Sequence, residues 1–132
     1  MKIRYSNDKA VQIWQRFVEN QADRAARRMF DKHFGATLAK RAIVLHEMLE
    51  QASNAHSFNA GQSANNKLEV MRGRRDNEHI VLKVRVNDAW RKFFNIIQSN
   101  GDALSNAMWQ GNYAEVNSLE VIDVNKHNYK AL

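Results

Sequence analysis

The stretch IVLKVRVNDAWRKFFNII, residues 80–97, decides the fold of this chain. Its first half carries apolar residues at every second position, namely Ile80, Leu82, Val84 and Val86. A period of two is typical of a strand with one buried face. Residues 87–89, Asn-Asp-Ala, supply turn chemistry, and the aromatic and apolar residues that follow suit a returning strand. The stretch therefore predicts a β-hairpin.

The charges of this hairpin indicate its register. A three-residue loop at 87–89 places Arg85 opposite Arg91 and leaves Lys92 as the one charge on the apolar face. A two-residue loop would put Arg91 on that face, which is the costlier arrangement. Two arginines directly opposite each other repel unless an anion neutralises them, and the planar guanidinium suits phosphate. We therefore expect a phosphate-binding sheet face that also carries Lys83.

Each residue group of this basic face, and of the turn before it, also has a second interpretation. Arg85 and Arg91 are alternatively exposed charges paired with Glu120 or Asp123, because surface ion pairs are common. Phe93 lies on the basic face, where it either stacks on a base or contacts a neighbouring side chain or a protein partner. A basic turn before the hairpin either binds RNA or is simply solvated, and it contains Arg72, Arg74 and Arg75.

Composition narrows the setting. The 132 residues predict a single domain, 1–132. Lysine and arginine number 20 against 14 acids, so the formal charge of +6 favours RNA, DNA or an acidic protein segment as partner. Cysteine is absent, which excludes disulfides and thiolate chemistry. The histidines lack metal-ligand spacing, and no apolar run reaches the length of a membrane span, so we expect no metal, no cofactor, no membrane and a cytoplasmic location.

The first half of the chain predicts a strand followed by helices. Residues 2–6 alternate charged and apolar side chains, as a short edge strand does. Apolar residues over 10–30 recur at helical spacing and predict one long amphipathic helix, which Gly35 closes. A second helix starts near Thr37, so the two form a helical hairpin. Residues 53–67 lose all periodicity and predict a long, mobile loop within the domain.

The second half predicts the rest of the sheet. A strand begins at 68–71, the last strand covers 119–124, and a polar tail follows at 125–132. Residues 103–117 are ambiguous between a short helix around Met108 and Trp109 and an irregular excursion. The predicted class is α+β, with the N-terminal strand and the helical hairpin packed on one face of a small twisted antiparallel sheet.

This order of elements, with Arg-Val-Asn-Asp-Ala-Trp-Arg at 85–91, resembles the RelE/HigB group of bacterial toxins, also called plasmid maintenance or killer proteins. Residues 71–73 are similar to the Leu-Lys-Gly of that group, and 121–123 resemble the start of its Val-Asp-Tyr-His ending. The resemblance implies a RelE-like fold and an endoribonuclease that cleaves mRNA on the ribosome through attack by the ribose 2′-hydroxyl. It also implies an antitoxin protein, mRNA and the ribosome as partners.

The resemblance further implies roles for individual residues. Arg91 would stabilise the pentacoordinate phosphate, Arg85 would assist, and Arg72 stands where the group carries lysine. The histidine of the group aligns with Asn125, which cannot exchange a proton near neutral pH. His127 has the residue type to replace it in general acid–base work. The remaining residues expected to contact RNA or phosphate are Lys83, Arg74, Arg75 and Phe93.

Three functions remain open from the sequence. The first is the endoribonuclease toxin of a toxin–antitoxin module. The second, favoured by Asn125, is a catalytically silent module of the same fold that holds an antitoxin-like partner or nucleic acid. The third is a generic basic RNA- or DNA-binding domain, whose binding would weaken steeply with salt.

Overall fold

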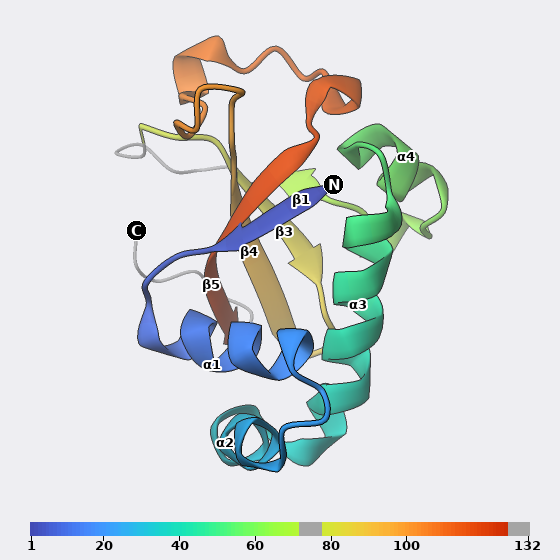
Figure 1. Cartoon of the computed structure of the whole chain (residues 1–132). Coiled ribbons are helices and arrows are strands. Elements are labelled where there is room, and N and C mark those ends of the chain that lie inside the picture. The colour runs from blue at the N-terminus through green and yellow to red at the C-terminus, as the bar shows by residue number, and fades with distance from the viewer. Residues whose placement is uncertain (72–77, 127–132) are drawn as a thin grey trace.

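A five-stranded sheet with the order β1-β5-β4-β3-β2 forms the centre of the computed structural model, which describes residues 1–71 and 78–126 (Figure 1). Its strands are β1 (Lys2–Tyr5), β2 (Glu69–Val70), β3 (Val81–Arg85), β4 (Trp90–Ile96) and β5 (Ser118–Lys126). The predicted edge position of β1 is confirmed. The sheet is mixed, however, because β1 runs parallel to β5, whereas a purely antiparallel sheet was predicted. Parallel pairing needs a long crossover, and the rest of the chain provides it.

The predicted hairpin register is confirmed. Arg85 lies opposite Arg91, and Lys92 lies on the face turned to the helices. The backbone N–H groups of Ala89 and Trp90 donate to Oδ1 of Asn87 at 2.9 and 2.8 Å. These bonds close the three-residue loop, so the turn chemistry of the sequence acts as expected.

The helices are α1 (Lys9–Glu19), α2 (Arg24–Phe34), α3 (Ala39–Gln51) and α4 (Ala55–Ala60). The single long helix predicted from apolar spacing is wrong, because α1 ends at Glu19, with Asn20 as its C-cap, and α2 begins after Asp23. Oδ1 of Asp23 accepts hydrogen bonds from the N–H groups of Ala25 and Ala26 at 2.9 and 3.2 Å, which starts a new helix. Gly35, with φ of 95°, ends α2 as predicted.

The loop predicted over 53–67 is also wrong, since this segment contains α4 and a 3₁₀ turn at Ala64–Asn66. Oδ1 of Asn54 caps α4 by accepting from the N–H of Ser57 at 2.8 Å. Phe58 is buried, and the N–H of Ala55 donates to the carbonyl of Val116 at 2.8 Å. A six-residue helix is too short to show periodicity, so capping and burial decide its conformation.

One hydrophobic cluster joins the helices to one face of the sheet, which we name the core face (Figure 1). Its largest members include Trp14, Phe17, Phe30, Leu45, Leu49, Leu82, Phe94 and Leu119. His46 is buried beside it and bonds the Tyr5 hydroxyl at 2.8 Å, in line with the expected semi-buried histidine. Residues 103–117 form an irregular excursion with 3₁₀ turns at Asn106–Met108 and Tyr113–Glu115. The opposite face of the sheet is named the outer face.

Candidate functional site

The outer face carries two short rows of side chains from β3, β4 and β5. The strand register places Lys83, Phe93 and Asp123 in one row and Arg85, Arg91 and Asn125 in the next. The prediction that Arg85 and Arg91 lie side by side on one face is therefore confirmed. This pairing brings two permanent positive charges together on the surface.

A cavity of about 210 Å³ opens at this place, and we name it the anion pocket. Its described lining residues are Asn65, Lys67, Glu69, Lys83, Arg85 and Arg91. Four of these six residues are cations and one is an acid, so the pocket attracts anions. The hairpin supplies three of the cations, and the segment leading into β2 supplies the rest of the lining.

The segment leading into β2 was missed as part of the site. Asn65 and Lys67 fall within the stretch that was predicted to be a mobile loop. Glu69 lies opposite Lys83 in the register of β2 and β3. The available signal was the alternation of Lys67, buried Leu68 and Glu69, which is typical of a strand with one buried face. The pairing itself joins residues far apart in the sequence, so no local pattern indicates it.

Arg91 is held against the hairpin loop. Its Nη1 donates to the carbonyls of Asn87 and Trp90 at 2.7 and 3.0 Å. Partial burial, followed by the positive charge of Arg85, lowers the pKa of Arg91. The guanidinium nonetheless keeps its charge at any physiological pH. The repulsion between the two arginines is the electrostatic cost that a bound anion would relieve.

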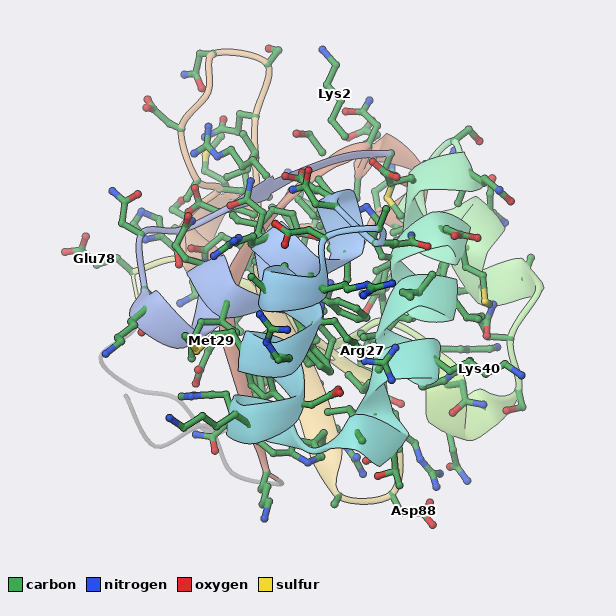
Figure 2. All side chains as sticks on the ribbon, turned by 60° about the horizontal axis from the view of Figure 1, so that its bottom comes forward. Lys2, Arg27, Met29, Lys40, Glu78 and Asp88 are labelled. Atoms are coloured by element: carbon green, nitrogen blue, oxygen red, sulfur yellow. The ribbon has the colours of Figure 1, made fainter. Side chains whose placement is uncertain are left out.

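The acids expected as alternative partners do not bind these arginines. Glu120 pairs instead with Arg4 at 2.8 Å. Oδ1 of Asp123 accepts from a backbone N–H, and burial raises the pKa of this carboxyl. Arg85 pairs with Asp88 of the hairpin loop, whose side chain is 92% exposed and points into solvent (Figure 2). An exposed pair of this kind contributes about 0–1 kcal/mol, so it leaves the pocket cationic.

Asn125 occupies the position opposite Arg91 at the end of β5. This is the position to which the resemblance assigns a histidine. Oδ1 of Asn125 accepts from the N–H of Lys126 at 2.8 Å. The amide can donate a hydrogen bond, but it cannot supply or take a proton. The expected substitute His127 and the expected basic residues Arg72, Arg74 and Arg75 lie outside the described residues.

Of the two interpretations of Phe93, its burial favours contact with neighbouring groups over stacking on a base. Phe93 lies on the outer face, as predicted, but it is only 1% exposed. A ring without accessible surface offers no platform to a base. The other expected outer-face residue, Lys83, does line the anion pocket.

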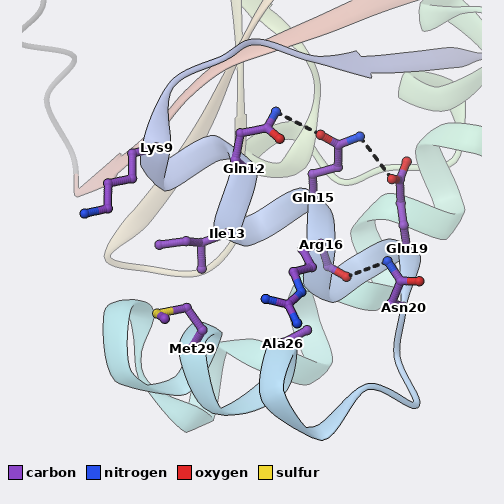
Figure 3. A pocket seen from close by; sticks show the side chains of 9 residues that line it. All are labelled: Lys9, Gln12, Ile13, Gln15, Arg16, Glu19, Asn20, Ala26 and Met29. Atoms are coloured by element: carbon purple, nitrogen blue, oxygen red, sulfur yellow. Dashed lines mark hydrogen bonds between the residues drawn. The ribbon is translucent and has the colours of Figure 1, made fainter.

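A larger cavity of about 510 Å³ lies between α1 and α2 (Figure 3). Lys9, Ile13 and Met29 point toward it from the two helices. Its polar side chains bond one another, because Gln15 accepts from Gln12 and donates to Glu19, each at 3.0 Å. Opposite charges are mixed along this cavity, so it lacks the cation cluster that distinguishes the anion pocket.

Comparison of the chain with family models, with curated proteins and with solved structures gave no match. Within residues 1–71 and 78–126, no three histidine, aspartate or glutamate side chains converge as metal ligands. No helix in the same ranges has the length and apolar character needed to cross a membrane. The fold and the site thus define an α+β protein with a cationic pocket on the outer face of its sheet.

Proposed function

We propose that this chain is a RelE/HigB-like toxin, an endoribonuclease that cleaves mRNA on the ribosome. The observation that carries the proposal is the Arg85–Arg91 pair, which shares one small cavity with Lys67 and Lys83. No acid of β5 neutralises this pair among the described residues. A phosphodiester would supply the missing negative charge and accept hydrogen bonds from the guanidinium groups.

The proposed reaction forms one bond and breaks another at phosphorus. The ribose 2′-oxygen attacks the adjacent phosphorus, a 2′,3′-cyclic phosphate forms, and the bond to the 5′-oxygen breaks. Negative charge accumulates on the non-bridging oxygens of the pentacoordinate phosphate. Arg91, aided by Arg85, would stabilise that charge, and loss of one such donor typically costs about 10²–10³ in rate.

Two proton transfers accompany this reaction. The 2′-hydroxyl loses a proton, and Glu69 is the only carboxylate among the described residues that line the anion pocket, so we assign it as the base. The leaving 5′-oxygen gains a proton. His127 remains the candidate donor by residue type, while Asn125 opposite Arg91 would contribute only a hydrogen bond from its amide.

The test compares an arginine that lines the anion pocket with one on the surface of a helix. Arg91→Ala is expected to reduce codon-positioned cleavage on translating ribosomes by about 100-fold or more and to relieve growth arrest on expression. Arg27→Ala is the matched control, because Arg27 lies on the helical surface in an exposed pair with Asp31 at 3.0 Å. This control should cut and arrest growth like the wild type. A folded Arg91→Ala protein that cuts normally would remove the proposal.

A second candidate function is a catalytically silent module of the same fold that binds an antitoxin-like partner or RNA. The observation that favours it is Asn125, which lies opposite Arg91 where the resemblance places a histidine. This function predicts RNA binding that depends on Arg91 without any cleavage on translating ribosomes. Detection of codon-positioned cuts by the wild-type chain would exclude it.

An antitoxin protein and the ribosome are the partners in the proposed function, and the bacterial cytoplasm is its setting. We expect a neighbouring reading frame to encode the antitoxin. Co-expression of that reading frame should restore growth of cells that express the wild-type chain. Continued arrest in the presence of a soluble product of that frame would contradict this pairing.

A further inference from the structure

A second cavity, of about 410 Å³, adjoins the anion pocket. Its described lining residues are Glu69, Val70, Trp109, Gly111 and Tyr113. The two cavities share Glu69, so β2 forms part of the wall of both. One cavity is therefore cationic and its neighbour is lined by aromatic rings.

The two rings come from the excursion at 103–117, drawn in orange in Figure 1. The centroids of Trp109 and Tyr113 lie 5.3 Å apart, with the ring planes at 85°. Both side chains are only partly buried against the hydrophobic cluster. Ring surface therefore remains accessible on the side of the cavity, in contrast to Phe93, which is buried.

Backbone hydrogen bonds hold this aromatic pair at both ends of the excursion. The N–H of Asn106 donates to the carbonyl of Glu78 at 2.8 Å, and the carbonyl of Val116 accepts from the N–H of Ala55 at 2.8 Å. Gly111, which lies between Trp109 and Tyr113 in the sequence, has a φ of 79°, a conformation in which other residues are strained. The rings are thus presented on a fixed support, which reduces the entropy cost of binding.

We infer that Trp109 and Tyr113 form a base-stacking subsite for a single-stranded RNA whose phosphate occupies the anion pocket. This inference rests on the proposed function and names how its substrate is held. Single-stranded nucleic acid is recognised by a cationic groove for the backbone together with aromatic rings for the bases. Glu69 lines both cavities, so these two elements lie next to each other on the molecule. The excess of cations in the anion pocket selects a polyanion rather than an apolar peptide as the occupant.

The test measures binding of a short single-stranded RNA with 2′-O-methyl riboses, which cannot undergo the attack. Trp109→Ala should weaken this binding by about tenfold, because base stacking on one aromatic ring typically contributes on this scale. Trp109→Phe should retain most of the affinity. Met108→Ala is the matched control, since Met108 is the preceding residue, is 64% exposed and does not line this cavity. Binding of inorganic pyrophosphate should be unchanged in all three variants.

A second measurement changes the RNA, and its first part needs only the wild-type chain. Replacement of single nucleotides in the same RNA by abasic units should find one position where the wild type loses about tenfold, and Trp109→Ala should lose nothing further there. Equal losses for Met108→Ala, a parallel loss of pyrophosphate binding, or no sensitive abasic position would overturn the subsite. Stacking without cleavage on ribosomes would overturn the proposed function alone, while cleavage that requires Arg91 but ignores Trp109 would overturn the subsite alone.

Discussion

Arg91 and Lys92 are neighbours in β4, yet their surroundings are opposite. Arg91 lies on the outer face, lines the anion pocket and bonds the carbonyls of the hairpin loop. Lys92 lies on the core face, is fully buried, and its Nζ makes no hydrogen bond with the described residues. One cation is placed where an anion can reach it, and the other is enclosed by the hydrophobic core.

The enclosure of Lys92 consists of aromatic rings. Its Nζ lies 5.4 Å from the ring centroids of Tyr5 and Trp14 and 5.8 Å from that of Phe94. Ring faces attract a cation, but loss of water dominates here, and burial lowers the pKa of Lys92 to about 7. Burial, followed by the charge of Lys92, also lowers the pKa of His46 nearby.

The contrast shows that the face of the strand on which a residue lies decides the free-energy cost of its positive charge. On the outer face, water and the anion pocket accommodate two adjacent arginines. On the core face, one lysine must give up its hydration without a hydrogen-bond partner, which is expensive. The outer-face charges are therefore expected to govern function, and Lys92 to govern stability.

The largest expected effect is on stability, from Lys92→Met. Replacement of a buried charge by an apolar side chain of similar length should raise the free energy of unfolding at pH 7 by about 1–4 kcal/mol. Lys83→Met is the matched control on the outer face and should change it by less than about 0.5 kcal/mol. Urea denaturation measures both. A large loss of stability in Lys92→Met would mean that contacts of the ammonium with the aromatic rings stabilise the fold by more than the burial of its charge destabilises it.

The next effect is a rise of stability with pH, most of which Lys92→Met should remove. The unfolded chain keeps the proton of Lys92 up to its ordinary pKa of 10.5, whereas the folded protein releases it near pH 7. The unfolded state therefore binds more protons between these values, and stability rises with pH by roughly 1 kcal/mol per unit. This gain in stability is complete above the pKa of Lys92 in the unfolded chain. It is lost as the pH falls to the pKa of Lys92 in the folded protein.

Denaturation between about pH 7 and 9.5 separates this contribution from those of His46 and Tyr5, but the amine of Met1, whose pKa burial lowers from 8.0, also titrates there. Below that window His46 titrates, and above it the unfolded-state ionisation of Tyr5, whose pKa burial raises in the folded protein, opposes the trend. The wild type should gain stability across the whole window, whereas Lys92→Met should keep only the smaller rise below about pH 8 that the Met1 amine gives and should be flat above it. An equally steep rise above about pH 8 in Lys92→Met would assign the titration to another group.

The smallest effect is expected at Asp88, the exposed residue that pairs with Arg85 at the end of the hairpin. Asp88→Asn removes the partner of Arg85, so affinity of the anion pocket for inorganic pyrophosphate should rise by up to about fivefold at low salt. Asp102→Asn makes the same charge change at an exposed turn away from the pocket and should have little effect. The gain should shrink as salt screens the charges. Equal gains in both variants would indicate that net charge alone matters.

Local sequence pattern was sufficient to predict the centre of the sheet and the part of the site that the hairpin forms. The alternation over 80–97 and the turn at Asn87 predict the register that pairs Arg85 with Arg91, because a strand shows its buried face at every second residue. The same pattern left Lys92 as a charge on the core face. The cap at Gly35 was also readable, since its conformation depends on the residue itself.

The rest was decided by contacts between residues far apart in the chain. The parallel pairing of β1 with β5, the burial of α4 and the placement of Lys67 and Glu69 beside the hairpin each need a partner from a distant segment. The break after Asn20 was missed because apolar spacing continues through it, and Asp23, which caps the new helix, has the residue type of a cap but does not by itself show that the chain turns. Periodicity reports which face of an element is buried, whereas the identity of its neighbour depends on how the whole chain packs.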